Sequence, residues 1–349
     1  MEELEALIEA GVAPSVAAGA AAERGFVWVT DVQGRTASYF DLASLTKPMT
    51  ALAVAWSGLD IRAPLGALID EARGTASERV PLELFLAHRA GLEAHLRLYE
   101  PLTRGERVDA GAALSRVAEA RREDARGEAP VEGFLPVYSD LGYVLAGAAL
   151  ARHLGVVDAG EAIERVIVAR LGTHTLGTAR GLSSRVPDFA ARVEPTEEVP
   201  WRDGVVRGAV HDENAWALTG EGGSGHAGMF GTVEGVLAFG CAALDATQRD
   251  ERLGWMVRER PGGSLRAGWD GKSAEGSSAG VRMGPRAFGH LGFTGTSLWI
   301  DPDARIVVTL LTNRVHPTRD NLAIRAARPR VHDALYARAL GLRSGCGSM

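Results

Sequence analysis

A serine and a lysine stand three residues apart in the segment FDLASLTKPMT, residues 40–50. A serine hydroxyl is a weak nucleophile unless a neighbouring group takes its proton. If Ser44 opens a helix, Lys47 lies one turn further along the same face, where its amine can reach the hydroxyl. The spacing therefore indicates a nucleophilic serine with a lysine as its proton acceptor. The alternative interpretation is structural, with Ser44 as a helix N-cap and Lys47 as a surface cation.

The rarity of lysine strengthens the catalytic interpretation. The chain has 38 lysine and arginine residues together, and its two lysines are Lys47 and Lys272. Arginine stays protonated in proteins, whereas lysine becomes neutral when its pKa is lowered. The choice of lysine at position 47 is therefore explained if the chemistry there requires a cation that can lose its proton. We attribute the abundance of arginine to compositional bias, because acidic residues are interleaved with the arginines throughout.

Two further segments carry groups that can take part in the same chemistry. Tyr138 and Asp140 lie two residues apart in VYSDLGY, directly before an apolar helical pattern. His290 and Gly292 lie in FGHLGFTGTS, on an expected strand where a glycine lets a substrate backbone approach closely. Each also has an ordinary interpretation: Asp140 as a helix N-cap, Tyr138 as a half-buried aromatic residue and His290 as a strand residue with a satisfied ring.

The elements that must position these groups follow from the apolar patterns. We predict a short helix that ends at Gly11, and then a hairpin whose strands are GFVWVTD and TASYFD, around DVQGR. Residues from about 57 to about 200 are mostly helical by pattern. The C-terminal part returns to strands, with FGHLGFTGTSLWID and IVVTLLTN on either side of the turn PDAR, and it closes with a helix despite Pro329. This order predicts an α+β protein whose sheet recruits strands from both ends around a helical insertion.

Taken together and in this order, the three motifs resemble those of the serine β-lactamase and penicillin-binding-protein superfamily. They read SLTK at 44–47, YSD at 138–140 and HLG at 290–292, where that superfamily carries SxxK, YxN or YxS, and KTG or HxG. The segments LFLAHRAGLEAH, GHAGMF and GFTGTSLWIDPDARIVVTLLTNRVHP resemble further phrases of the class C β-lactamases and the related esterases and D-amino peptidases. The resemblance runs from about residue 12 to about residue 320.

The resemblance implies an antiparallel sheet flanked by the N- and C-terminal helices, beside an inserted mainly helical domain. We expect residues 1–56 and 205–349 to form the discontinuous sheet domain and residues 57–204 the helical domain. The active site is then expected in the cleft between the two domains.

The resemblance also assigns roles to individual residues. Ser44 would be the nucleophile that becomes acylated and Lys47 its proton acceptor. Tyr138 would relay a proton to the leaving group or help to activate water, and Asp140 would hydrogen-bond Lys47 and the substrate amide. His290 would replace the lysine of the third motif.

Further positions are expected to bind the substrate around the nucleophile. The oxyanion hole would consist of the backbone N–H groups of Ser44 and Phe293, which are donors aimed at charge that develops in the transition state. The expected substrate contacts are Leu291, Gly292 and Trp216.

Two departures from the family pattern change the expected chemistry. An ionised Asp140 beside Lys47 would raise the pKa of the lysine and oppose its role as a free base. Either Tyr138 then carries more of the base function, or Asp140 is neutral or turned away. His290 is mostly neutral at pH 7, because the ordinary pKa of histidine is about 6.5, so we expect weaker anchoring of a penicillin carboxylate than a lysine provides.

Other motifs lead to no cofactor. GKS at 271–273 lacks the glycine that a phosphate-binding loop needs, because Arg266 stands there. His211, Asp212 and Glu213 are consecutive and would point different ways, so we expect loop hydrogen bonds there and no metal site. His226 is expected to support the wall of the site. We expect no cofactor and no metal.

The bulk composition limits the partners. A net charge of −6 gives no global attraction to nucleic acid or to an anionic membrane, and no apolar run is long enough to span a bilayer. The first residues lack the basic and apolar pattern of a secretory signal, so we expect a cytoplasmic protein. The cysteines, Cys241 and Cys346, cannot form a disulfide framework. The sequence leaves the oligomeric state open.

These observations favour a serine hydrolase that acts through an acyl-enzyme on a small ester or amide. A true β-lactamase or a DD-peptidase is the alternative within the fold. A non-catalytic ligand-binding or sensor protein is the alternative of another class, which the presence of both Ser44 and Lys47 disfavours.

Overall fold

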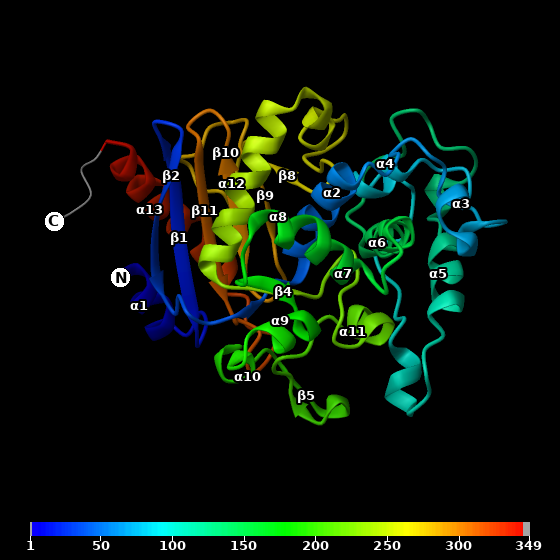
Figure 1. Ribbon diagram of the computed structural model, residues 1–349, viewed down its shortest axis with the longest axis horizontal. Coiled ribbons are helices and arrows are strands. Elements are labelled where there is room, and N and C mark those ends of the chain that lie inside the picture. Colours follow the sequence, from blue (N-terminus) through cyan, green and yellow to red (C-terminus); the bar gives the residue numbers. More distant parts are fainter. Residues whose placement is uncertain (1, 345–349) are drawn as a thin grey trace.

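A six-stranded antiparallel sheet forms the centre of the computed structural model, which describes residues 2–344 and therefore leaves Cys346 outside (Figure 1). The strand order is β2-β1-β11-β10-β9-β8, so two strands from the N-terminal part of the chain lie beside four from the C-terminal part. The strands are β1 (Val16–Arg24), β2 (Val27–Gly34), β8 (Asp270–Gly271), β9 (Phe288–Leu291), β10 (Ser297–Asp301) and β11 (Ile306–Thr312).

Helices cover both faces of this sheet. The N-terminal α1 (Glu2–Glu9) and the C-terminal α13 (Ile324–Ser344) pack on one face, and α12 (Val233–Arg249) packs on the other (Figure 1). The central strand β11, IVVTLLT, is buried along its whole length, as its run of apolar and β-branched residues requires between two helical layers. The expected α+β architecture with flanking terminal helices is confirmed.

The predicted hairpin was wrong. β2 pairs with β1, whose sequence VAAGAAAER has few β-branched residues and gave no strand signal. Small residues suit β1 because α12 and α13 approach it closely from both faces. A Cβ atom at Gly19 would lie 2.8 Å from Cδ1 of Leu237 on α12. The segment TASYFD supplies β3 (Phe40–Asp41), which pairs with a different strand.

A smaller three-stranded sheet, β3-β7-β4, joins the nucleophile segment to distant parts of the chain. β7 (Met229–Gly231) lies in the middle, between β3 and β4 (Leu176–Thr178). A separate two-stranded ribbon consists of β5 (Glu198–Val199) and β6 (Gly204–Val205).

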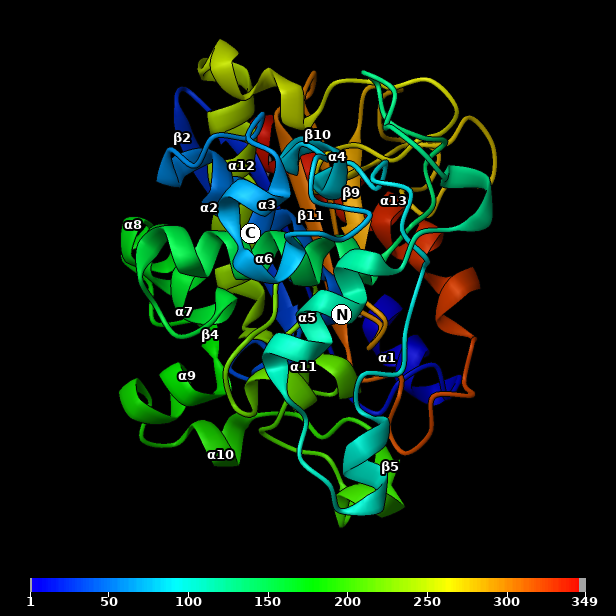
Figure 2. The same ribbon diagram turned by 90° about the vertical axis from the view of Figure 1, so that its right-hand side faces the viewer.

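The segment between β3 and β7 is rich in helices, which lie in front of the large sheet in the view of Figure 2. Its α-helices are α2 (Thr46–Ser57), α3 (Leu65–Leu68), α4 (Leu82–Leu86), α5 (Ala110–Glu119), α6 (Asp140–Leu154), α7 (Ala159–Ile163), α8 (Ala169–Leu171), α9 (Ala179–Arg185), α10 (Phe189–Arg192) and α11 (Glu213–Thr219). A π-helical turn at Glu164–Val168 joins α7 to α8, and 3₁₀ turns lie at Ala43–Leu45, Asp70–Ala72, Glu100–Arg104, Glu123–Ala125, Pro200–Arg202 and Glu251–Met256.

One hydrophobic cluster continues from the sheet into the helices. It contains Phe288 and Val307 of the sheet together with Phe85 and Tyr143 of α4 and α6. The helix α2, expected in the sheet domain, contacts α6, α7 and the π-helical turn. The division at residues 56/57 and 204/205 therefore stays a prediction. Within residues 2–344, no helix combines the length and apolar character needed to cross a bilayer.

Candidate active site

Ser44 stands in a short, strained turn at the start of α2. Ala43, directly before it, has a left-handed φ of 47°, which costs an alanine about 1 kcal/mol. The turn is held by Asp41, whose Oδ1 accepts the N–H of Ala43 at 2.8 Å. Strained residues of this kind gather at functional sites, where the surrounding structure fixes them. The local fold therefore presents Ser44 at the edge of a cavity, one turn before Lys47.

Lys47 connects Ser44 to Asp140. Its Nζ donates to Oγ of Ser44 at 2.8 Å and lies 2.7 Å from Oδ1 of Asp140. The lysine side chain is fully buried, and Asp140 is the first residue of α6, where the helix dipole favours a negative charge. The predicted proximity of Ser44, Lys47 and Asp140 is present, and Asp140 is not turned away.

Burial and neighbouring charges have opposing effects on the pKa values of Lys47 and Asp140. Burial alone lowers the pKa of Lys47, but Asp140 outweighs it and holds the pKa of the ammonium above its ordinary value. Burial likewise raises the pKa of Asp140, yet Lys47 and the nearby His95 hold it well below its usual range. The resting site therefore contains an ammonium and a carboxylate, with the ammonium bound to the Ser44 hydroxyl.

Tyr138 covers Lys47 on the cavity side. The lysine Nζ lies 4.8 Å from the centroid of the Tyr138 ring, and His88 stacks on that ring at a centroid distance of 4.7 Å. Burial raises the pKa of Tyr138, although Lys47 and Ser44 act in the opposite direction. The phenol is therefore protonated at neutral pH and has to lose its proton before it can act as a base.

His290 faces the same group from the end of β9. Its ring centroid lies 5.9 Å from that of Tyr138, and its Nδ1 donates to the carbonyl oxygen of Leu291 at 2.9 Å. Burial and the charge of Lys47 lower the pKa of His290 to about 3. The ring is therefore neutral at pH 7, as expected, and its Nε2 carries the lone pair. The third motif supplies no fixed cation.

The loop after β9 is bonded to the nucleophile turn. Oγ1 of Thr294 donates to the carbonyl of Asp41 at 2.7 Å, and Oγ1 of Thr296 donates to the carbonyl of Leu42 at 3.0 Å. A Cβ at Gly292 would lie 2.7 Å from that Leu42 oxygen. The lack of a side chain at Gly292 thus makes room for the Leu42 carbonyl of the chain itself, whereas the sequence predicted room for the backbone of a substrate. Leu291, Gly292 and Phe293 line the same cavity as Ser44.

The cavity has a volume of about 470 Å³. Its lining combines the predicted groups with an aromatic and arginine-rich wall: Ala43, Ser44, His95, Tyr99, Tyr138, Asp140, His211, Asp212, Glu213, Ala227, Leu291, Gly292, Phe293, Arg314, Arg319, Leu322, Ile324, Arg325 and Arg328. Trp216 is absent from this lining among residues 2–344, which differs from its predicted contact with substrate. Its ring lies against Trp201 at 5.8 Å and under the Arg202 guanidinium at 4.2 Å, and so supports α11.

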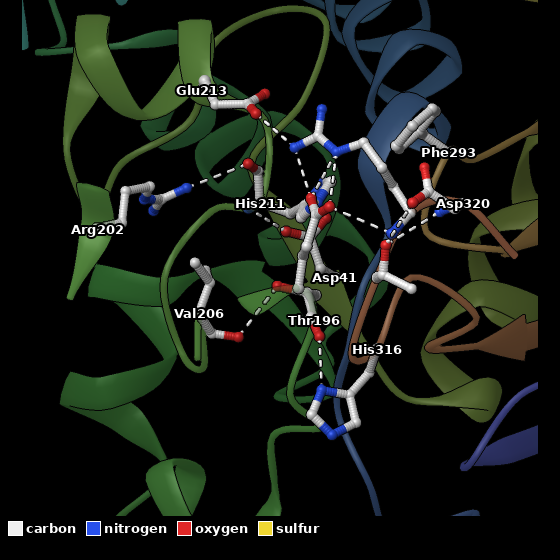
Figure 3. A network of polar contacts seen from close by, with 12 residues as sticks. Asp41, Thr196, Arg202, Val206, His211, Glu213, Phe293, His316 and Asp320 are labelled. Atoms are coloured by element: carbon white, nitrogen blue, oxygen red, sulfur yellow. Dashed lines mark hydrogen bonds and ion pairs between the residues drawn. The ribbon is translucent and has the colours of Figure 1, made fainter. Parts of the chain in front are cut away.

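A polar network supports the turn and the loop from one side (Figure 3). The backbone N–H of His211 donates to Oδ2 of Asp41 at 2.7 Å, and the His211 ring stacks on Phe293 at 5.7 Å. Nε2 of His211 lies 3.0 Å from Glu197, which also binds Arg319. Burial raises the pKa of Glu197, but His211 and Arg319 overcome it and lower the pKa to about 2. This network therefore supports Asp41, which holds the turn before Ser44, and Phe293, which lies in the loop after β9.

The consecutive residues 211–213 point to different partners, as expected. Asp212 caps α11 through Ala215 N–H and binds Nε2 of His226 at 2.9 Å. Burial raises the pKa of Asp212, but His226 reverses the effect and the pKa falls to about 2. The carbonyl of His226 in turn accepts from Lys47 at 3.4 Å. His226 therefore supports the wall of the site at Lys47.

Sequence reasoning missed His88 and His95. Both lie in the quoted phrase LFLAHRAGLEAH, but neither has a fixed spacing from Ser44 that would single it out. Nδ1 of His95 lies 3.7 Å from Oδ2 of Asp140, and this contact raises the pKa of the half-exposed imidazole. His88 accepts the N–H of Ser139 at 3.0 Å, and burial lowers its pKa to about 3.

Comparison with known proteins places this geometry in a family. A family model described as Beta-lactamase matches residues 4–331. A Salmonella gallinarum protein described as "Putative D-alanyl-D-alanine carboxypeptidase" is 28% identical over 226 residues, which are 58% of this chain and 49% of that protein. The chain thus spans about half the length of the curated relatives it matches.

Two solved structures share the fold over nearly the whole chain. A class C β-lactamase from Rhodobacter sphaeroides has a TM-score of 0.65 at 16% identity, over 96% of this chain and 98% of that one. EstCE1, described as a hydrolase with promiscuous acyltransferase activity, has a TM-score of 0.61 at 16% identity, with the same coverage of 96% and 98%. Because the family model extends over almost all of the described residues, the chain belongs to the Beta-lactamase family.

Proposed function

We propose that the chain is a serine hydrolase that forms an acyl-enzyme at Ser44 with a small ester or amide. The observation that carries the proposal is the position of the Lys47 Nζ, 2.8 Å from the Ser44 hydroxyl and 2.7 Å from Asp140. Ser44 and Asp140 line a cavity of about 470 Å³, large enough for a small substrate. A non-catalytic protein would not need this buried lysine and its bond to the serine.

The proposed reaction has two steps. The Ser44 oxygen forms a bond to the substrate carbonyl carbon, and its proton passes through the Lys47 and Tyr138 groups to the leaving oxygen or nitrogen. The bond from the carbonyl carbon to that leaving atom breaks, which leaves an ester on Ser44. Water then attacks this ester, releases the acid and returns the proton to Ser44. The N–H groups of Ser44 and Phe293 would stabilise the oxyanion in both steps.

The protonation states of Lys47 and Tyr138 determine which proton must be lost before Ser44 can attack the substrate. Lys47 is an ammonium and Tyr138 a phenol, so one proton has to leave this pair to create a base. A lysine pKa raised by Asp140 disfavours a free amine at neutral pH. The two groups are in contact, so we treat the base as the Lys47–Tyr138 pair rather than as one residue.

The neutral His290 favours ester or amide substrates over β-lactams that are anchored by a third-motif cation. A β-lactamase or a DD-peptidase is the second candidate. The observations in its favour are the descriptions of the Salmonella relative and of the Rhodobacter structure.

Initial rates with 4-nitrophenyl butyrate and with a chromogenic cephalosporin test the proposal, with Ser44→Ala as the control. We expect ester hydrolysis that is lost in Ser44→Ala, with little cleavage of the cephalosporin. Fast cleavage of the cephalosporin that depends on Ser44 would replace the proposal by the second candidate. Ester hydrolysis that persists in Ser44→Ala would contradict the assigned nucleophile.

A further inference from the structure

The second step of the proposed reaction requires a group that takes a proton from the attacking water. Lys47 and Tyr138 both hold their protons in the resting site. Burial lowers the pKa of Lys47 but Asp140 outweighs it, and burial raises the pKa of Tyr138. The Lys47 ammonium also donates to Oγ of Ser44 at 2.8 Å, so it is placed to return a proton to that oxygen when the acyl ester breaks. A different group is therefore needed to accept the proton of the water.

Four histidines of the site are poorly suited to this task. His88 and His290 are buried, burial lowers the pKa of each to about 3, and neither is part of the cavity lining among residues 2–344. His211 lines the cavity, but it is 3% exposed and its Nε2 lies 3.0 Å from Glu197. Both ring nitrogens of His226 are bonded within the wall. These four rings are weak bases or are already engaged.

His95 differs from them in both respects. It lines the cavity with a side chain that is 48% exposed, so water reaches its ring. Its Nδ1 lies 3.7 Å from Oδ2 of Asp140, and a carboxylate on that side holds the imidazole proton on Nδ1 and leaves the lone pair on Nε2. No hydrogen bond joins Nε2 to another residue in the described part of the chain. The ring therefore presents a free basic nitrogen.

The charges around His95 strengthen that nitrogen as a base. Asp140 raises the pKa of the imidazole, burial opposes the rise, and the more distant Asp212 and Glu213 add to it. A separation of 3.7 Å is longer than a hydrogen bond, but contacts between catalytic groups are often long before a substrate binds. His95 and Asp140 thus have the arrangement of a base and the carboxylate that orients it.

The backbone on both sides of His95 is anchored. The carbonyl of Ala94 accepts the N–H of Asp140 at 3.1 Å. The carbonyl of Leu96 accepts Nδ2 of Asn214 at 2.7 Å, and Asn214 is itself buried. The loop between α4 and α5 therefore holds the imidazole beside Asp140, although the ring itself is not packed into the core. A half-exposed surface histidine without a function would not require these bonds.

The contacts form a continuous series from the nucleophile to His95. Ser44 Oγ lies 2.8 Å from Lys47 Nζ, which lies 2.7 Å from one oxygen of Asp140, whose other oxygen faces His95. Asp140 therefore acts on both ends of the series: it keeps the proton on the lysine and it orients the imidazole. This second contact gives a reason for a carboxylate at position 140, since an amide oxygen carries no charge to stabilise an imidazolium.

We propose that His95, oriented by Asp140, is the base that activates water for attack on the acyl ester of Ser44. The inference rests on the proposed function and assigns its second step. The water oxygen forms a bond to the acyl carbon while one water proton passes to Nε2 of His95. The bond from that carbon to Oγ of Ser44 breaks, Oγ takes a proton from Lys47, and the acid leaves. His95 then releases its proton to the solvent and Lys47 takes one up.

Burst kinetics with 4-nitrophenyl butyrate test the assignment. In His95→Gln we expect the deacylation rate constant to fall about 100-fold, within the usual range for loss of a general base. Formation of the acyl-enzyme should continue, so that kcat and KM fall together and kcat/KM changes little. A burst of 4-nitrophenolate close to one per enzyme should precede the slow phase. The control is His153→Gln, an exposed histidine of α6 outside the cavity, which should leave both constants unchanged.

Two further readouts separate a base from a residue that only supports the loop. Mass spectrometry of the quenched His95→Gln reaction should find the butyryl ester on the peptide that contains Ser44, in a larger fraction of the protein than without the substitution. Imidazole added to His95→Ala should restore part of the deacylation rate, because a soluble base can occupy the vacated space. Loss of a structural contact would not be repaired in this way.

The possible failures are distinguishable. An unchanged deacylation constant in His95→Gln, or equal losses in kcat and kcat/KM without a trapped ester, would overturn the role of His95 while the hydrolase assignment stands. The same holds if the unaltered protein is acylated at Ser44 but does not release the acid. An unaltered protein that neither hydrolyses the ester nor becomes acylated would refute the proposed function, and the assignment of His95 with it.

Discussion

At the scale of single residues, the contact between Lys47 and Asp140 decides how Ser44 can lose its proton. Asp140 is ionised, and its Oδ1 lies 2.7 Å from the lysine Nζ. A carboxylate at this distance stabilises the ammonium, so proton loss from the Lys47–Tyr138 pair is displaced to higher pH. Activity should therefore rise with pH across the neutral and mildly alkaline range.

Replacing the carboxylate tests this account of the pH dependence. In Asp140→Asn the lysine loses the charge that raises its pKa, so the rising limb of kcat/KM against pH should move to lower pH by about one unit or more. The matched control is Asp109→Asn, which caps α5 and makes no contact with Lys47. A limb that stays in place in Asp140→Asn, or a flat profile between about pH 6 and 9 in the unaltered protein, would contradict the account.

The contact between Lys47 and Ser44 was predictable from sequence spacing, whereas the roles of Tyr138, Asp140 and His290 followed from the resemblance to a family. An interval of three residues at a helix start places Lys47 beside Ser44, whatever the rest of the fold does. His95 reaches Asp140 only through a loop between two helices, and no local pattern encodes that contact. Trp216 was predicted in the cavity from its position near a site loop, but packing against Trp201 and Arg202 turns it elsewhere.

At the scale of elements, the loop after β9 and the turn before α2 act as one unit. Thr294 and Thr296 donate to two successive carbonyls of the nucleophile turn, Asp41 and Leu42. These bonds set the distance between the two N–H groups proposed for the oxyanion hole. The sequence contained these threonines in FTGTS, but their partners lie about 250 residues away, so spacing could not reveal them.

Thr294→Val tests this coupling. The valine leaves the buried Asp41 carbonyl without a donor, at a cost of about 1–3 kcal/mol in the free energy of unfolding. Since the turn also carries Ser44, kcat/KM should fall about tenfold. Thr309→Val removes a comparable buried bond, from Oγ1 to the carbonyl of Ser297 at 2.8 Å, within the sheet. It should lower the melting temperature similarly and leave kcat/KM unchanged; equal kinetic losses in both variants would argue against the coupling.

The composition of the chain does not show that some of its arginines lie together in the fold. Their abundance looked like a bias of the whole chain, and many of them do form ordinary surface pairs. Arg314, Arg325 and Arg328 differ because α13 and the loop before it carry them to one cavity wall. That placement depends on the packing of the last helix against the sheet, which the sequence pattern does not specify.

At the scale of the whole molecule, one core supports both the sheet and the helices around the site. The order of strand and helix patterns predicted the α+β class, and the resemblance to a family predicted the flanking terminal helices. β1 escaped prediction because its alanines satisfy packing between two helical layers rather than strand propensity. The fold persists at 16% identity to the Rhodobacter structure, so fold alone does not set the substrate.

We propose Ser44 as the nucleophile of this cavity. Treatment with a fluorophosphonate probe, followed by mass spectrometry of the peptides, tests it most directly. We expect one adduct, on the peptide that contains Ser44, and none in Ser44→Ala. A protein that stays unlabelled, or one labelled at another residue, would contradict it.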